Sequence, residues 1–160
     1  MASIINVDKV RATGSTTDGL TIDSSGRVLT PARPAFHAYS NTGSNSYFSA
    51  NAEAVWNSTL VNIGDCYSTS TGRFTAPIAG TYFFMVTMLS SSGERLFFRM
   101  RKNGSDIAGT FVETLAVTGL YQSVSTSATI TLAVNDYVSV YLTTTAYGGS
   151  YGNFNGHLLG

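Results

Sequence analysis

An all-β fold is the class that this sequence predicts, and three observations indicate it. The chain of 160 residues, 43% of them hydrophobic, is long enough for one domain with its own core. Short apolar runs recur along it, and no stretch repeats apolar residues with the period of a helix. Turn-forming Gly, Ser and Asn residues separate these runs at the spacing of a β-sandwich, so we expect about ten antiparallel strands.

Residues 1–33 have a different pattern from the remainder. A few apolar residues, a polar linker at 12–19 and a Gly-containing turn predict short strands with too little apolar surface for a core. We expect this arm to become ordered by docking on a particle or by intertwining with other copies; a loose leader is the alternative. The candidate docking residues are Ile4, Ile5, Val7, Leu20, Ile22 and Val28. Pro31 and Pro34 each remove a backbone donor and mark a boundary, which gives domains at 1–33 and 34–160.

The remaining strands are predicted in order from alternation and turn signals. Asn103-Gly104 is a strong hairpin signal, because both residue types tolerate the positive φ angles of a two-residue turn. The strand at 81–89 is apolar on both faces, whereas an antiparallel sandwich strand normally has one polar face. An exposed apolar row of this kind indicates an interface. The expected strands are 36–39, 47–48, 54–56, 59–62, 81–89, 94–103, 107–112, 121–132, 137–142 and 154–158.

The segment 56–84 carries regularly placed aromatic, Asn and Gly residues. They are Trp56, Asn62, Tyr67, Phe74, Gly80, Tyr82 and Phe84. This spacing resembles the signature of the C1q globular head, within the wider tumour necrosis factor (TNF) superfamily. That signature begins with Phe where this chain has Trp56, and it closes with an aromatic residue where this chain has Val86. The resemblance extends from about Pro34 to the last residue, and it implies a C1q/TNF-like jelly roll with these residues in its core.

The resemblance also implies a homotrimer, because in the family the sheet that contains this central strand packs around a three-fold axis. The second face of the strand at 81–89 would then lie in the interface, together with two histidines on strands expected in the same sheet. The residues predicted for the trimer interface are Phe83, Met85, Leu89, His37 and His157. A structural role for the histidines is favoured over metal binding, since neither has an acidic residue at ligand spacing.

Composition and motifs argue against several functions. Only 11% of residues are charged and the formal net charge is +0, which disfavours nucleic acid and membranes as partners. Cys66 is the single cysteine, so we expect a buried apolar group; a reactive or intermolecular thiol is the alternative. The segment 148–152 matches a nucleophile-elbow spacing, but no acidic residue follows it and no helix is predicted there. Since Asp65, Asp106 and Asp136 form no contiguous calcium loop either, we predict no catalytic residues, no cofactor and no metal.

The segment 20–28, LTIDSSGRV, resembles the N-terminal portions of bacteriophage fibre and virion-surface proteins. No signal peptide or membrane-spanning stretch is visible in the sequence, which favours assembly in a host cytoplasm and location on the virion. We therefore expect a non-enzymatic homotrimer that is a short fibre, a spike or knob, or a capsid decoration protein. Its arm would dock on capsid or tail proteins and its jelly roll would project for host attachment.

Two questions stay open at this point. Tyr147 and Tyr151 lie in a glycine-rich loop and are candidates for stacking on host-surface glycans, while packing within the turn is their alternative role. The alternative function for the whole chain is a free C1q-domain recognition module, lectin-like or signalling, that is not attached to a virion.

Overall fold

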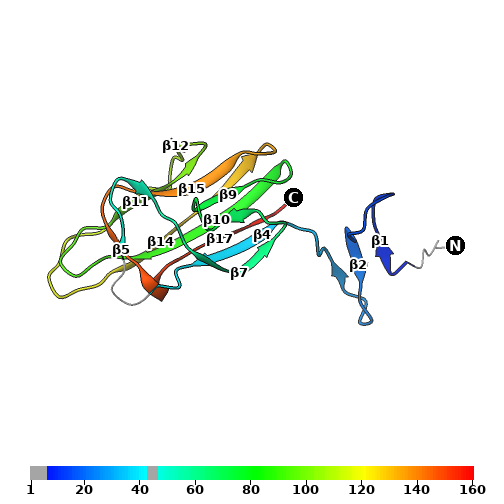
Figure 1. The fold of residues 1–160 in the computed structure, drawn as a ribbon, viewed down its shortest axis with the longest axis horizontal. Coiled ribbons are helices and arrows are strands. Elements are labelled where there is room, and N and C mark those ends of the chain that lie inside the picture. Colours follow the sequence, from blue (N-terminus) through cyan, green and yellow to red (C-terminus); the bar gives the residue numbers. More distant parts are fainter. Residues whose placement is uncertain (1–6, 43–46) are drawn as a thin grey trace. The chain divides into compact units, whose positions relative to one another are not determined.

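A computed structural model describes residues 7–42 and 47–160 of the chain. Contacts between residues divide the chain into two compact units, Met1–Arg33 and Pro34–Gly160. Figure 1 shows the elements of both units, coloured along the sequence. Each unit is described by itself below.

The first unit is a three-stranded antiparallel sheet in the order β1-β2-β3. Asp23 shapes the turn between its last two strands, because its Oδ1 accepts hydrogen bonds from the backbone N–H groups of Ser25 at 2.9 Å and Arg27 at 3.0 Å. None of the side chains that the structure describes in this unit is buried, and the predicted docking residues Ile4 and Ile5 lie outside the described residues. The strands are β1 (Lys9–Val10), β2 (Leu20–Ile22) and β3 (Val28–Leu29).

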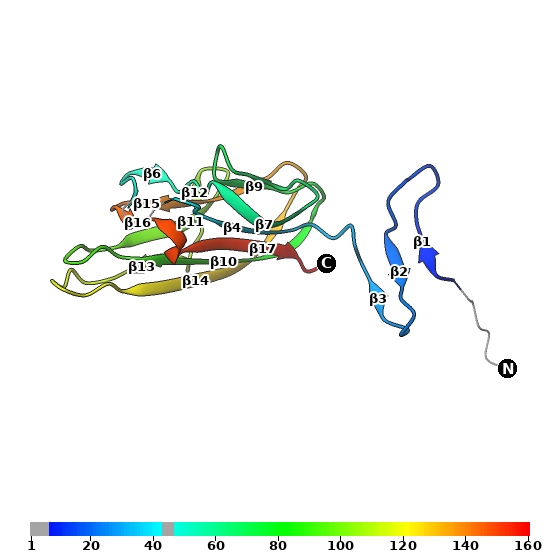
Figure 2. The same cartoon turned by 60° about the horizontal axis from the view of Figure 1, so that its bottom comes forward.

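The second unit is a sandwich of two antiparallel sheets, which Figure 2 shows as two layers. We name each sheet after one of its central strands. The β10 sheet has the order β5-β16-β10-β17-β4-β7, and β14 pairs with β10 along its whole length. Its strands are β4 (Ala35–Tyr39), β5 (Tyr47–Phe48), β7 (Ser58–Ile63), β10 (Gly80–Leu89), β14 (Ser123–Leu132), β16 (Ala146–Tyr147) and β17 (Asn153–Leu158).

The β11 sheet has the order β12-β11-β15-β9-β8, with β13 paired to β11 and β6 paired to β15. A 3-10 turn, η1 (Gly149–Tyr151), joins β16 to β17 in the other sheet. The predicted all-β sandwich is therefore confirmed. The strands of the β11 sheet are β6 (Ala52–Glu53), β8 (Tyr67–Ser68), β9 (Arg73–Thr75), β11 (Phe97–Lys102), β12 (Ser105–Asp106), β13 (Val112–Glu113) and β15 (Tyr137–Leu142).

The core lies between the two sheets and is built largely from aromatic rings. Alternation along β10 turns four of its side chains inward, as the sequence predicts: Tyr82, Phe84, Val86 and Met88. Phe74 is 0% exposed and its ring lies 5.0–5.3 Å from the rings of Phe36, Tyr82 and Phe84. Because these rings come from both sheets, the aromatic cluster fixes the spacing between the layers.

Two strand predictions are wrong. The expected return strand at 107–112 is replaced by the two short strands β12 and β13. Between them the hydroxyl of Thr110 accepts a hydrogen bond from the N–H of Met100 at 3.0 Å and donates one to the carbonyl of Ile107 at 2.8 Å. The Thr110 side chain therefore replaces the backbone carbonyl that would pair with Met100 in a continuous strand. The strand expected at 54–56 lies instead at β6, two residues earlier.

Candidate functional site on the outer face of the β10 sheet

Asn62 organises the long loop that leads from β7 to β9. Its Oδ1 accepts the N–H of Tyr67 at 3.0 Å, and its Nδ2 donates to the carbonyl of the same residue at 3.0 Å. The side chain therefore imitates the backbone partner that a neighbouring strand would provide. The Tyr67 hydroxyl in turn lies 3.3 Å from both the N–H and the carbonyl of Trp56, which holds the loop against the core.

Two glycines of this region stand where a side chain would collide. Gly72 has φ +73°, and a Cβ there would strike the backbone carbonyl of Ala54. A Cβ on Gly80 would lie 2.6 Å from Cδ1 of Leu158. The backbone contact and the positive φ explain why glycine occupies position 72, whereas at position 80 a Cβ would require the flexible Leu158 side chain to shift.

Most of the positions predicted for the core are buried in the structure. Five of them are buried, Asn62 is half-buried and Gly80 is half-buried at the start of β10. Cys66 is buried beside them, and burial raises the pKa of its thiol to about 11, so the thiol stays protonated at neutral pH. The five buried positions are Trp56, Tyr67, Phe74, Tyr82 and Phe84.

The residues predicted for an interface share the outer face of the β10 sheet. Phe83 lies opposite His157 of β17, with the two ring centroids 5.7 Å apart. Met85, 36% exposed, lies opposite Asn155, and Asn155 lies opposite His37 of β4. The structure thus brings these side chains together in one patch, and Leu89 stands farther along β10 on the same face.

Two neighbouring strands extend this face in different ways. On one side, β14 presents a row of hydroxyls, and Thr87 Oγ1 lies 2.8 Å from Ser125 Oγ. On the other, the edge strand β7 exposes Leu60, Val61 and Ile63. In the sequence, the run Leu60-Val61 within the strand expected at 59–62 is the signal for this apolar edge. The hydroxyl row comprises Ser123, Ser125, Ser127, Thr129 and Thr131.

Comparison with known proteins decides the family. The model of the C1q domain matches residues 35–159. The chain belongs to the C1q domain family. Complement C1q tumor necrosis factor-related protein 3 from Homo sapiens and from Mus musculus are each 27% identical over 106 residues, which are 66% of this chain and 42% of those proteins. The chain spans about two-fifths of the length of these curated relatives.

Solved structures agree with this assignment. The globular domain of zebrafish complement 1qA protein has a TM-score of 0.67 at 23% sequence identity, covering 80% of this chain and 98% of that one. Eiger TNF from S. frugiperda has a TM-score of 0.63 at 15% identity, covering 81% of this chain and 94% of that one. Likeness at these identities shows the fold, and the predicted C1q/TNF-like jelly roll is confirmed.

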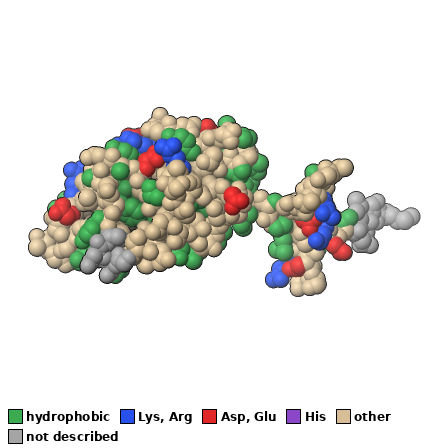
Figure 3. Space-filling model, in the orientation of Figure 1, with side chains coloured by type: hydrophobic (Ala, Val, Ile, Leu, Met, Phe, Trp, Pro, Cys, Tyr) green, Lys and Arg blue, Asp and Glu red, His purple; other side chains and the backbone are tan. Residues whose placement is uncertain are grey.

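The charges of the C1q domain are divided unevenly between its sheets. None of the described strands of the β10 sheet contains Asp, Glu, Lys or Arg. Figure 3 shows acidic and basic side chains gathered near β12, which belongs to the other sheet. The strands of the β11 sheet hold Glu53, Arg73, Arg99, Arg101, Lys102, Asp106 and Glu113.

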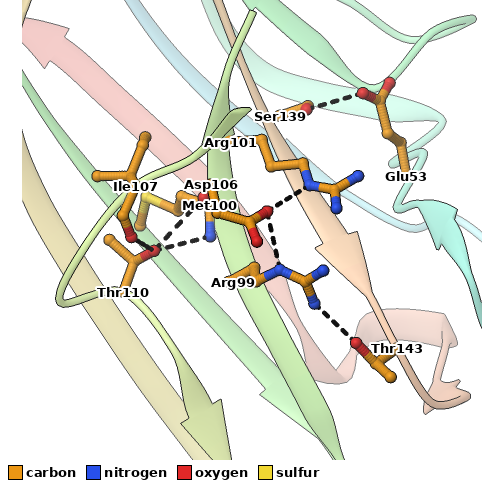
Figure 4. Close-up of polar contacts among 9 residues, drawn as sticks. All are labelled: Glu53, Arg99, Met100, Arg101, Asp106, Ile107, Thr110, Ser139 and Thr143. Atoms are coloured by element: carbon orange, nitrogen blue, oxygen red, sulfur yellow. Dashed lines mark hydrogen bonds and ion pairs between the residues drawn. The ribbon is translucent and has the colours of Figure 1, made fainter. Parts of the chain in front are cut away.

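An ion-pair network occupies the outer face of the β11 sheet (Figure 4). The Nε atoms of Arg99 and Arg101 lie 2.9 and 2.6 Å from Oδ1 of Asp106, and Arg99 Nη1 donates to Thr143 Oγ1 at 2.7 Å. The hydrogen bonds from Arg101 and then Arg99 lower the pKa of Asp106. The Arg101 guanidinium also stacks 3.5 Å from the centroid of the Tyr141 ring. Alternation along β11 places these arginines on the face opposite the buried Phe98 and Met100, but sequence alone does not show their shared carboxylate.

Four tyrosines gather at the end of the β10 sheet that holds Leu89. Tyr147 pairs with Leu89 and with Tyr47 across neighbouring strands. Tyr147 and Tyr151 are the two residues that the sequence singles out as a ligand loop. The structure adds Tyr47 and Tyr121, whose rings lie 5.3 and 5.7 Å from that of Tyr147. Because these residues are far apart in the chain, only strand pairing reveals that they form one cluster.

The remaining sequence motifs stay apart in the C1q domain. Ser150, in the nucleophile-elbow spacing, lies in η1, which leads into strand β17 rather than into a helix. Among the described residues no group of three or more His, Cys, Asp or Glu side chains could hold a metal ion, so Asp65, Asp106 and Asp136 do not converge. Within residues 7–42 and 47–160, no helix has the length and hydrophobicity needed to cross a membrane.

Proposed function

We propose that this protein is a non-enzymatic structural protein that forms a homotrimer through the outer face of the β10 sheet. The observation that carries the proposal is the composition of that face, whose described strands contain no Asp, Glu, Lys or Arg. Phe83 and Met85 lie at its centre and remain partly exposed in the single chain. Depletion of charge around apolar and aromatic side chains is typical of the core of a protein interface.

The first unit supports the proposal that the trimer is mounted on a particle. Val7 is 42% exposed and Val28 is 62% exposed, while Leu20 and Ile22 are only half-buried. A three-stranded sheet with no described buried side chain gains little stability from its own packing. We propose that this arm docks on a capsid or tail protein of a bacteriophage virion, as the fibre-like segment 20–28 suggests, and that the C1q domain is a spike, short fibre or decoration that contacts the host surface.

The second candidate is a free recognition module. It is favoured by the curated relatives, which are C1q tumor necrosis factor-related proteins of human and mouse rather than virion proteins. Both candidates use the same trimer, so they differ in what the arm does. A test of the arm therefore separates them.

The experiment has two stages. Light scattering on the full chain should give the mass of a trimer, and a stable monomer would overturn the assembly. A chain that begins at Pro34 should then remain folded and trimeric, since the second unit contains its own core. It should fail to join particles that were prepared without this protein in a reconstitution assay. The full-length variant Ile22→Asp is the matched control, because it disrupts the apolar arm without shortening the chain. Particle binding by the truncated trimer as strong as that of the full chain would mean that the docking surface lies outside the arm, and failure of the full chain to join the particles would favour the free module.

A further inference from the structure

Three tyrosines of the four-tyrosine cluster border a half-open hollow of about 410 Å³, whose described lining is Leu89, Tyr121, Tyr147 and Tyr151. Its volume lies within the range of about 300–1,000 Å³ that is usual for small-molecule sites. Tyr147 is the centre of the cluster, because the rings of Tyr47, Tyr121 and Tyr151 all meet it nearly edge to face at 5.3–5.7 Å. Such packing holds the rings at fixed angles without covering them, since those three outer tyrosines remain 54–56% exposed.

We propose that this hollow is a binding site for an uncharged sugar ring. The proposal deepens the role of surface contact proposed above, and it rests on that role only for the source of the sugar. A pyranose has an apolar C–H face and a rim of hydroxyls. Tyrosine matches both, because its ring offers an apolar surface and its phenol both donates and accepts hydrogen bonds.

The electrostatics of the site favour a neutral ligand. The described lining contains no Asp, Glu, Lys, Arg or His, so nothing there would pair with a charged group. Burial, followed by the nearby phenols of Tyr151, Tyr47 and Tyr121, raises the pKa of Tyr147. The Tyr147 phenol therefore stays uncharged at neutral pH and adds no charge to the lining.

A second hollow provides room for a neighbouring sugar. Tyr47, whose ring packs against that of Tyr147, lines a smaller space of about 110 Å³. Its other described walls include Ser40, Asn57 and Gly148. Hydroxyl, amide and backbone groups of this kind fit the hydroxyls of a second ring, so the site would prefer a disaccharide over a monosaccharide.

Shape argues for a small ligand rather than a second copy of the chain at this place. The patch around Phe83 and Met85 is the surface of regular strands, which another sheet face can cover. A hollow of 410 Å³ would be left partly empty by such a face, and unfilled space forfeits contact energy. We therefore assign Leu89, which the sequence predicts for the trimer interface, to the hollow instead; it is six residues from Phe83 along β10, or about 20 Å at the usual strand rise.

The test is saturation-transfer NMR on the full chain with glucose, galactose, mannose, N-acetylglucosamine and their neutral disaccharides, with N-acetylneuraminic acid as a charged probe. We expect transfer to ring protons of at least one neutral sugar. Tyr121→Ala and Tyr151→Ala should each weaken binding about two- to tenfold, the usual worth of an aromatic stacking contact. Tyr151→Phe should weaken it less, because the ring face remains. Leu120→Ala is the matched control, since Leu120 is similarly exposed beside Tyr121 but does not line the hollow.

Three results would overturn the proposal. They are no binding of any neutral sugar, preferred binding of N-acetylneuraminic acid, and unchanged binding by both alanine variants. Light scattering on the same variants tests whether the tyrosines instead contact another copy of the chain. A loss of trimer mass in Tyr121→Ala or Tyr151→Ala would assign the cluster to contacts between copies and also overturn the proposal. Failure of sugar binding leaves the trimer mass and particle docking untouched, so it is distinguishable from failure of the proposed function.

Discussion

The two sheets of the C1q domain have outer faces of opposite chemistry: the described strands of one carry charged residues and those of the other do not. Each belongs to a sheet whose inner face is buried in the shared aromatic core. The face of the β11 sheet satisfies its charges internally: Arg99 and Arg101 share Asp106, and Arg73 lies 2.8 Å from Glu53. The face of the β10 sheet has no charged residue in its described strands and leaves Phe83 partly exposed.

This difference favours one of the two faces for the proposed assembly. The ion pairs of the β11 sheet are complete within one chain, and covering them would require removing charged groups from water at a cost. The β10 face would lose little solvation of charge if covered and would bury Phe83, Met85 and the apolar edge of β7. The comparison therefore points to the β10 face for assembly and leaves the β11 face for solvent.

The largest expected effect comes from removing what the two faces share. Phe74 is fully buried between the sheets, so Phe74→Ala should cost about 3–5 kcal/mol of unfolding free energy. Urea denaturation followed by circular dichroism measures it. Phe111→Ala, at a residue that is 49% exposed, is the control and should change stability much less. An unchanged urea midpoint of the Phe74 variant would mean that the loop from β7 to β9 does not organise the fold.

A single negative charge should distinguish the faces. Phe83→Asp or Met85→Asp would place an unpaired carboxylate in the proposed interface, which costs on the order of 3–5 kcal/mol, and the trimer should dissociate. Thr75→Asp places the same charge on an exposed position of the β11 sheet and should leave the trimer intact. Light scattering at equal protein concentration compares the three variants. Dissociation by Thr75→Asp alone would reverse the assignment of the faces.

The spacing of residues in the segment 56–84 predicted the fold well because residues such as Asn62 make contacts with nearby parts of the same segment. Asn62 bonds the backbone of Tyr67 only five residues away, and Gly72 and Gly80 stand where backbone or a neighbouring side chain comes close. Alternation along β10 likewise separated its inner and outer side chains correctly. Effects of this kind are visible in a single stretch of chain.

Features that depend on distant segments could not be predicted in this way. Tyr47, Tyr121 and Tyr147 meet only because β5, β16 and β10 are neighbours and β14, which follows Tyr121, pairs with β10; no local pattern specifies this. The return strand after β11 was predicted wrongly because Thr110 is compatible with a strand until its hydroxyl is seen to replace a backbone partner. The trimer interface and particle docking remain predictions.

A moderate effect is expected from opening the network on the β11 face. Asp106→Asn would leave Arg99, whose side chain is only 12% exposed, without its carboxylate. Because Asp106 is itself 36% exposed, water screens the pair and the expected cost is about 1 kcal/mol, with no change in oligomeric mass. Glu113→Gln removes a more exposed partner, that of Arg95, and should cost less. A loss of trimer on Asp106→Asn would show that this face also contacts a partner.

The smallest effect should appear as a dependence of stability on pH. Asp136 accepts hydrogen bonds from Lys102 Nζ, Asn103 Nδ2 and the N–H of Ala133, and these lower its pKa from 3.8 to about 2. A carboxyl with a depressed folded-state pKa stabilises the fold above its unfolded pKa, and this contribution disappears as the pH falls from about 4 to about 2. Melting temperatures of the parent and Asp136→Asn, compared at one protein concentration, should therefore differ near neutral pH and converge toward pH 2. A gap that stays constant across this window would show that the carboxylate's charge does not stabilise the turn.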